Sequence, residues 1–116
     1  KKKNIKFEKK KKKNNVTMGD WVYYKVHVDG SSAGVVSMKE RDSQGFLDLY
    51  VSFVEPPTIS SYDLVASQTD SNVHEIQIFV DQPQTRLMYI GVHGNGYITH
   101  PDVDYYFFIY AWASPF

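Results

Sequence analysis

The strongest constraint on the fold of this chain is a hydrophobic pattern that repeats every two residues. In the segment WVYYKVHV, residues 21–28, Val22, Tyr24 and Val26 alternate with Trp21 and Tyr23 and with the polar residues that follow. A period of two is typical of a β-strand with one buried face, whereas an amphipathic helix repeats every 3.6 residues. No stretch of the sequence has the helical repeat over a useful length. The chain is therefore expected to be built from strands.

Further segments of strand character follow, and turn-forming residues separate them. The expected strands are residues 21–28, 33–39, 46–54, 73–80, 86–93 and 104–112. Many short strands joined by polar turns are typical of an antiparallel β-sandwich or jelly roll. The sequence therefore predicts an all-β, antiparallel β-sandwich of jelly-roll type, with no helix longer than two turns.

The same alternation predicts which side chains form the core. The expected core residues are Val22, Tyr24, Val26, Leu47, Leu49, Val51, Phe53, Ile76, Ile78, Ile90 and Val92. Asp48 points to the face opposite Leu49 and is interpreted as an ordinary acid on the outer side of a strand. Pro56 and Pro57 then end the strand, because proline has no N–H group for pairing. Residues 60–63 are expected to cross to the other sheet.

Charge divides the 116 residues into two parts. Residues 1–13 contain nine lysines and one glutamate, a net charge of +8, whereas residues 14–116 contain four basic and twelve acidic residues, a net charge of −8. The lysine-rich part has too little apolar surface to offset the entropy of ordering. Residues 1–15 are therefore predicted to be a flexible arm or linker, and residues 16–116 the sandwich domain. An arm that lies on the acidic body, or that binds nucleic acid or an anionic membrane, remains open.

The first residue, the apolar runs and the cysteine content indicate what kind of protein the chain belongs to. The chain begins at Lys1 rather than Met, so it is expected to be a processed product or a piece of a longer protein. No run approaches the roughly 18 apolar residues that a membrane-spanning helix needs. Cysteine is absent, so no disulfide framework is expected.

The segment DLYVSF, followed by PPTISSYDL, resembles the central signature of the bacterial pre-peptidase C-terminal domain family. In that family an Asp-Leu-Tyr-Val strand leads into a Pro-Thr-x-x-Ser-Tyr-Asp segment. GDWVYYKVHV, SNVHEIQIFV and LMYIGVHGNGY resemble other strands of the family in the same order, and the likeness covers about residues 17–112. The turn at 98–103, the very aromatic last strand and the lysine-rich arm depart from the pattern.

The resemblance implies a β-sandwich that is an appendage of a larger secreted or surface protein. Collagen-binding modules of clostridial collagenases belong to the same broad group; some bind calcium near the start of the domain and contact their polymer through tyrosines on a sheet face. On this resemblance Asp20 and Asp48 are the candidate calcium ligands, with Asn14 and Asn15 in the adjoining linker. The positively charged arm opposes a cation there. The prediction is therefore no cofactor, with calcium as the alternative.

Recognisable catalytic motifs are absent from the sequence. There is no Gly-x-Ser-x-Gly elbow, no cysteine nucleophile and no glycine-rich phosphate loop, and His74-Glu75 lacks the second histidine of a zinc protease motif. His93, His100, Asp102 and Asp104 lie in or beside one glycine-rich hairpin, where polar residues are expected without a metal. The chain is therefore predicted not to be an enzyme.

Aromatic residues occupy both faces of the expected last strand, DYYFFIYAW. Tyr105, Phe107, Ile109 and Ala111 share one face, and Tyr106, Phe108, Tyr110 and Trp112 share the other. One face must belong to the core, and the other must lie under a loop, the arm, a neighbouring domain, a partner chain or a ligand. The predicted contact surface is Trp21, Tyr106, Tyr110 and Trp112, or Tyr105, Phe107 and Tyr23 if the strand is turned.

These features predict a noncatalytic, extracellular or cell-surface module, structural or adhesive, that packs through aromatic sheet faces against neighbouring domains or identical chains. The alternative is an accessory domain of a secreted hydrolase that binds an extracellular polymer or glycan, of carbohydrate or collagen type. Nucleic-acid binding is disfavoured, because the acidic body repels phosphates. Asn15-Val16-Thr17 is an N-glycosylation sequon, which favours the secreted setting.

Overall fold

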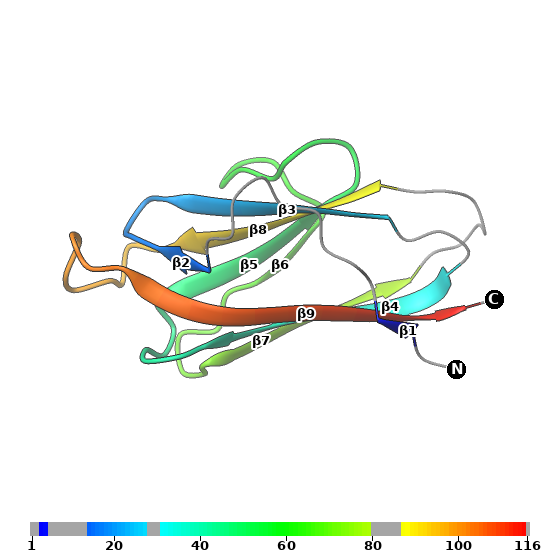
Figure 1. The fold of residues 1–116 in the computed structure, drawn as a ribbon. Helices are drawn as coiled ribbons and strands as arrows, with labels where there is room; N and C mark the ends of the chain where they lie inside the picture. Colours follow the sequence, from blue (N-terminus) through cyan, green and yellow to red (C-terminus); the bar gives the residue numbers. More distant parts are fainter. Residues whose placement is uncertain (1–2, 5–13, 28–30, 80–86, 116) are drawn as a thin grey trace.

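The computed structural model describes residues 3–4, 14–27, 31–79 and 87–115, and these residues form strands and loops without a helix (Figure 1). The strands are β1 (Lys3–Asn4), β2 (Asn15–Val16), β3 (Trp21–His27), β4 (Ser31–Glu40), β5 (Leu47–Ser52), β6 (Leu64–Ala66), β7 (Val73–Phe79), β8 (Leu87–Gly94) and β9 (Tyr105–Pro115). No helix in this part of the chain is long and apolar enough to cross a membrane.

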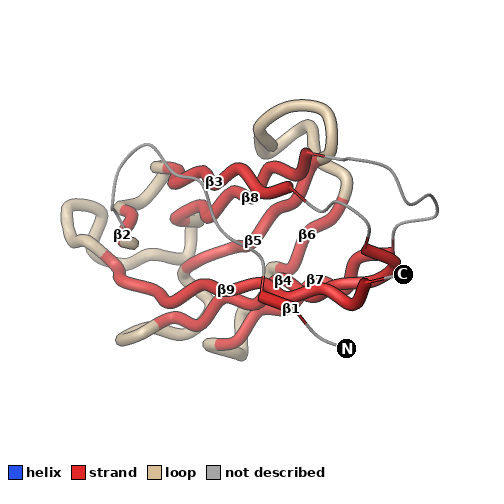
Figure 2. The backbone as a smooth tube through the Cα atoms, turned by 45° about the vertical axis from the view of Figure 1, so that its right-hand side comes forward, coloured by secondary structure: helices blue, strands red, loops and turns tan. Residues whose placement is uncertain are grey.

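The strands form two antiparallel sheets that pack face to face (Figures 1 and 2). One sheet has the order β1-β9-β4-β7, with β2 also paired to β9, and the other has the order β3-β8-β5-β6. The predicted antiparallel β-sandwich is confirmed. The six expected strands correspond to β3, β4, β5, β7, β8 and β9, although residues 28, 80 and 86 of their expected ranges lie outside the described residues. The short strands β1, β2 and β6 were not predicted, because two or three residues carry no periodicity.

The core lies between the two sheets and agrees closely with the alternation. Ten of the eleven expected core residues are buried, and Phe53 is half-buried against the same cluster. The structure adds to the core Val16, Val36, Met38, Met88, Phe107 and Ala111. Tyr24 is buried with its hydroxyl donating to Asn14 Oδ1 at 2.9 Å, and burial raises the pKa of this phenol to about 12. Period two therefore identified the inward faces correctly.

The segment around the predicted arm contributes two short strands to the edge of β9. Lys3 and Asn4 pair with Ala113 and Trp112, and Asn15 and Val16 pair with Tyr106 and Tyr105. The remaining arm residues, 1–2 and 5–13, lie outside the described residues. The predicted division between arm and domain at residues 15 and 16 therefore stays a prediction.

The chain after β5 does not follow the expected path. Residues 53–63, here called the cover loop, return over the sheet that they leave and lead into β6, which pairs with β5. The turn is held by the Thr58 N–H bond to the Ser61 carbonyl, at 2.8 Å, and by the Asp63 carboxylate, which accepts from the Phe53 N–H at 2.8 Å. The predicted crossing at residues 60–63 was wrong, and the chain crosses to the other sheet only between β6 and β7.

Candidate functional site

The outer face of β9 carries a row of aromatic side chains, Tyr106, Phe108, Tyr110 and Trp112, here called the aromatic stripe. Tyr106, Phe108 and Tyr110 are 41%, 57% and 53% exposed, whereas Trp112 is half-buried. The residues between them face inward: Phe107 and Ala111 are buried, and Tyr105 and Ile109 pack against the core. The alternation in this strand is as predicted, and the turned alternative with Phe107 outward is wrong.

The neighbouring strands add polar groups to the same face of the sheet. Phe108 lies opposite Lys39 of β4, and Tyr110 lies opposite Ser37, whose partner on β7 is Glu75. Residues opposite each other on antiparallel strands project to the same side, so Lys39 and Glu75 flank the aromatic stripe. Both side chains are exposed. The face is therefore aromatic along β9 and mixed along β4 and β7, where Lys39 and Glu75 lie beside the exposed Val73.

Arg41 caps one end of the aromatic stripe. Its guanidinium carbon lies 4.4 Å from the centroid of the Tyr106 ring, within the range of a cation–π contact. The same guanidinium donates to the neighbouring Asp42 carboxylate at 2.7 Å. Arg41 thus covers part of the Tyr106 ring, and Phe108 and Tyr110 are the most exposed residues of the stripe.

Trp21 does not join the aromatic stripe, although the sequence grouped them. It lies on β3, in the other sheet, and its side chain faces outward because Val22 and Tyr24 face the core. The two outer faces of a sandwich point in opposite directions. The predicted surface of Trp21, Tyr106, Tyr110 and Trp112 is therefore two separate surfaces.

The outer face around Trp21 forms a packed aromatic cluster. Trp21 stacks on Tyr23 with ring centroids 5.3 Å apart and lies 5.1 Å from Tyr50 and 4.4 Å from His93. Gly91 lies beneath it: a Cβ atom there would approach the indole ring to 2.9 Å. The absence of a side chain at Gly91 therefore lets the indole lie flat against the sheet.

The cover loop packs on this cluster from outside and covers part of it, with Tyr23 still 37% exposed. The Tyr23 hydroxyl donates to the Pro57 carbonyl at 2.8 Å, and the Pro57 ring lies about as close to Gly91 as the indole does. Tyr62 of the loop packs edge-on against Tyr50, with centroids 5.1 Å apart. The prolines and the Ser-Ser-Tyr-Asp segment thus form a lid that packs on the strand they follow.

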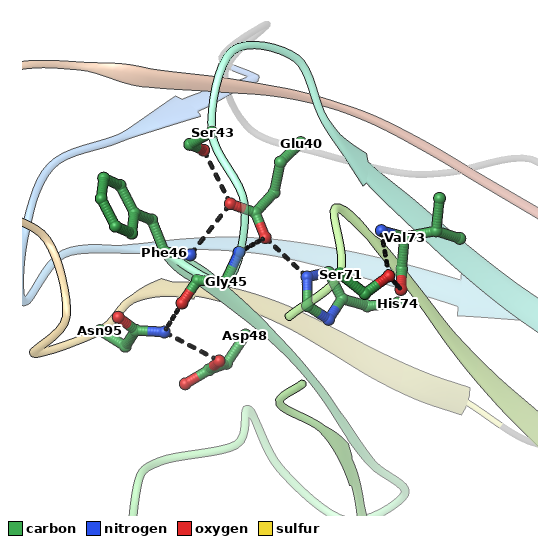
Figure 3. Close-up of polar contacts among 9 residues, drawn as sticks. All are labelled: Glu40, Ser43, Gly45, Phe46, Asp48, Ser71, Val73, His74 and Asn95. Carbon is green, nitrogen blue, oxygen red and sulfur yellow. Dashed lines mark hydrogen bonds and ion pairs between the residues drawn. The ribbon is translucent and has the colours of Figure 1, made fainter. Parts of the chain in front are cut away.

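Asp48 lies at the end of this covered face and is buried, which corrects its interpretation as an ordinary surface acid. Its Oδ1 accepts from Asn95 Nδ2 at 3.0 Å, and the same amide donates to the Gly45 carbonyl at 2.8 Å (Figure 3). Burial raises the pKa of Asp48. The facing His93 is also buried, and burial lowers the pKa of its imidazole.

A second buried polar group, Glu40 with His74, was not predicted. The carboxylate lies 2.6 Å from His74 Nε2, both side chains are 0% exposed, and the pair joins β4 to β7 (Figure 3). Glu40 also accepts from Ser43 Oγ and from the N–H groups of Gly45 and Phe46. Burial alone raises the pKa of Glu40, but these hydrogen bonds outweigh it and the pKa is lowered.

The sequence does contain a signal for this pair. On β4, Glu40 continues the series of alternate residues Val36 and Met38 that face the core. On β7, His74 lies two residues before Ile76 and faces the core as Ile76 does. A polar residue at an inward position near a strand end needs a partner when it is buried. The two residues are 34 positions apart, so the pairing itself follows from the register of β4 with β7.

The candidate metal ligands do not form a cluster. Asp20 is exposed, whereas Asp48 is buried and bonded to Asn95. His93 of β8 is buried, but His100 and the two aspartates that follow it, in the loop after β8, are exposed. Among the described residues no group of three or more histidine, cysteine, aspartate or glutamate side chains is placed to hold a metal ion.

Comparison with known proteins places the fold. The sequence matches no family model and no curated protein sequence. The pre-peptidase C-terminal domain of a collagenase from Bacillus anthracis is similar in structure, with a TM-score of 0.51 and 13% identity over 85% of this chain and 83% of that chain. The family resemblance in the sequence is thus confirmed in the fold that the two chains share.

Two carbohydrate-binding modules are also similar to this chain. One belongs to lichenase 5A of Cellvibrio mixtus, solved with cellotriose, at a TM-score of 0.46 and 12% identity over 98% of this chain and 90% of that one. The other is a β-1,3-glucan-binding module from Bacillus halodurans. Its TM-score is 0.47, and its sequence is 16% identical over 97% of this chain and 93% of that chain.

Proposed function

We propose that this chain is a noncatalytic binding module that contacts its partner through the aromatic stripe. The observation that carries the proposal is a difference in how far the two outer faces are covered. The cover loop packs on the Trp21 face and leaves Tyr50 and His93 buried there, with Tyr23 37% exposed, whereas Tyr106, Phe108 and Tyr110 are exposed in one row with no such loop among the described residues. Large exposed aromatic groups gain much apolar burial on contact and often dominate binding energy.

A noncatalytic role is supported by the use of the buried ionisable groups. Glu40 holds the turn at residues 43–46, and Asp48 with Asn95 fastens the same turn to β8. These carboxylates are engaged in hydrogen bonds that maintain the fold. The structurally similar collagenase domain, named as a C-terminal domain of its protein, also agrees with an accessory role.

The setting proposed for the module is extracellular or at a cell surface, as one domain of a larger protein or assembly, without a cofactor. The first candidate partner is a neighbouring domain or an identical chain that buries the aromatic stripe. The second is an extracellular polymer of carbohydrate or collagen type. The second is favoured by one observation: Lys39 and Glu75 flank the aromatic rings, so one face offers both stacking surfaces and hydrogen-bonding groups.

Replacing two stripe tyrosines tests the proposal. The variant carries Tyr106→Ser and Tyr110→Ser, and the control carries Tyr97→Ser, which removes a 66% exposed tyrosine from the loop between β8 and β9, outside the aromatic stripe. Sedimentation velocity measures self-association, and co-sedimentation with cellulose, insoluble β-1,3-glucan and collagen fibrils measures polymer binding. We expect the double variant to lose whichever association the unmodified protein and the control both show.

The outcomes separate the two partners. Concentration-dependent dimers without polymer binding favour an identical chain, and retention on one polymer favours the accessory role. An unmodified protein that stays monomeric, binds none of the polymers and binds a hydrophobic dye no better than the double variant would contradict the proposed contact surface.

A further inference from the structure

The sequon Asn15-Val16-Thr17 lies beside the aromatic stripe in the folded chain. Asn15 is the Cα partner of Tyr106, and Val16 is the partner of Tyr105. Val16 is completely buried in the core, so its neighbour Asn15 projects to the outer face, on the same side as Tyr106. Asn15 is half-buried at the edge of its sheet. The modification motif and the proposed contact surface therefore share one face.

We propose that Asn15 carries an N-linked glycan, and that the first sugars of this glycan lie over the aromatic stripe and control access to it. In the attachment step Asn15 Nδ2 forms a bond to the anomeric carbon of an oligosaccharide. The donor is an oligosaccharide linked to a lipid diphosphate, and the lipid diphosphate leaves as the amide nitrogen loses one proton. The Thr17 hydroxyl completes the motif that the transferase recognises.

Distance along the sheet supports the contact between the glycan and the aromatic stripe. Directly opposite residues of an antiparallel pair have Cβ atoms about 4.5–5.5 Å apart, and the diagonal neighbours are about 7–8 Å away. Tyr106 is directly opposite Asn15, and Phe108 is a diagonal neighbour. Arg41 already covers one face of the Tyr106 ring. The first sugar rings therefore reach the remaining Tyr106 surface and the Phe108 ring, the most exposed of the row.

The glycan would regulate access to the aromatic stripe. This covering role rests on the proposed function of the stripe, whereas the attachment of the glycan does not. A sugar ring has an apolar face of C–H groups that packs on aromatic rings, and its hydroxyls keep the covered surface wet. An attached glycan has a very high effective concentration at a neighbouring site and competes with any external partner. Chains that carry the glycan should leave the aromatic stripe unavailable, and chains that lack it should leave it open.

Intact mass tests the attachment. The 116-residue chain is secreted from a eukaryotic host that performs N-glycosylation, and four forms are compared: unmodified, Asn15→Gln, Thr17→Val and Thr17→Ser. The sequence contains no second sequon, so the assignment is direct. We expect a glycan mass on the unmodified chain and on Thr17→Ser, which keeps the motif, and none on the other two. If the chain without substitutions is folded and secreted but lacks the extra glycan mass, the proposal is overturned.

Dye binding and self-association test the covering role. The glycosylated protein is compared with the same protein after enzymatic removal of the glycan, which converts the asparagine to aspartate, and with an Asn15→Asp variant as the matched control. We expect the glycosylated form to lose dye binding and association that the other two share. A glycosylated form that binds as well as the deglycosylated one overturns the covering role, whereas failure of the Proposed function appears separately, as absent binding in every form.

Discussion

Both outer faces of the sandwich carry aromatic residues, but among the described residues a loop packs on only one of them. On β3, Trp21 and Tyr23 point outward, and on β9, Tyr106, Phe108 and Tyr110 point outward. The eleven-residue cover loop packs on the first face, with a bond from the Tyr23 hydroxyl to the Pro57 carbonyl, although Tyr23 is still 37% exposed, and the second face has no such loop among the described residues. Aromatic residues on the outer face of a strand therefore indicate a need for a cover, and the source of that cover differs between the two sheets.

The difference appears within single strands. Every residue of β5 is buried, because one of its faces packs in the core and the other lies under the cover loop and its neighbours. β9 is buried on one face alone: Phe107 is buried and Phe108 is exposed. A strand buried on both faces is typical of the middle of a three-layered arrangement. The cover loop thus acts as a partial third layer on one side of the domain.

The largest effect is expected in the core beneath the covered face. Leu49→Ala removes a completely buried side chain, and such a change costs about 2–5 kcal/mol of unfolding free energy through lost burial and the cavity left behind. Urea denaturation followed by tryptophan fluorescence measures the loss. The volume-conserving Leu49→Met serves as control and should cost less than about 1.5 kcal/mol. A loss below half a kcal/mol for the alanine variant would show that Leu49 does not face the core.

Trp21→Ala tests whether the covered face behaves as a second small core. The indole contacts Tyr23, Tyr50 and His93 but is half-buried, so we expect a cost of about 2–3 kcal/mol, below the range for a fully buried tryptophan. The loss is measured by urea denaturation followed by circular dichroism, since the variant lacks one of the two tryptophans. Tyr97→Ala is the control on an exposed aromatic residue. Equal losses for the two variants would remove the distinction between a covered and an open aromatic group.

Glu40→Gln tests the turn that anchors the covered sheet. The glutamine keeps the shape but weakens four hydrogen bonds to a charged acceptor, so we expect a loss of about 1.5–3 kcal/mol at neutral pH. Because the folded-state pKa of Glu40 lies below the ordinary value of 4.5, its contribution is complete above that pH and disappears as the pH falls through the folded-state pKa. Unfolding free energies measured between pH 7 and pH 3 should therefore converge for the two proteins.

Asp48→Asn also removes a buried carboxylate, but here the change in unfolding free energy is expected to have the opposite sign. The folded-state pKa of Asp48 is raised, so its ionised form opposes folding at neutral pH, and this opposition disappears as the pH falls below the ordinary value of 3.8. Asparagine keeps an oxygen to accept from Asn95 and removes the charge. We expect the variant to be at least as stable as the unmodified protein at pH 7, with the difference gone in acid. A large loss at pH 7 would show that the buried charge stabilises the fold.

The smallest effect is expected on the open face. Phe108→Ser removes a 57% exposed ring, and surface substitutions of this kind change stability by no more than about 0.5 kcal/mol. The same urea titration and a dye-binding measurement are made on one sample. We expect unchanged stability with reduced dye binding. A loss comparable to that of Trp21→Ala would mean that the ring is covered in solution by another part of the chain or by a second copy.

The sequence by itself determined the six longer strands, their inward faces and the two sets of outward aromatic residues. The physical reason is local: side chains alternate along a strand, so the parity of a residue decides its face once the strand forms. The same rule places Glu40 and His74 inward, and the resemblance of DLYVSF and the residues after it pointed to the fold. These inferences needed no knowledge of which strands pair.

The tertiary structure decided which face a loop covers in part and which polar groups meet. The return of the cover loop onto its own sheet covered part of the Trp21 face, and the register of β4 with β7 brought Glu40 to His74. Assignment of β3 and β9 to different sheets separated Trp21 from the aromatic stripe, and the pairing of β2 with β9 set Asn15 beside Tyr106. All four depend on contacts between residues far apart in the chain, whose energies a local pattern does not contain.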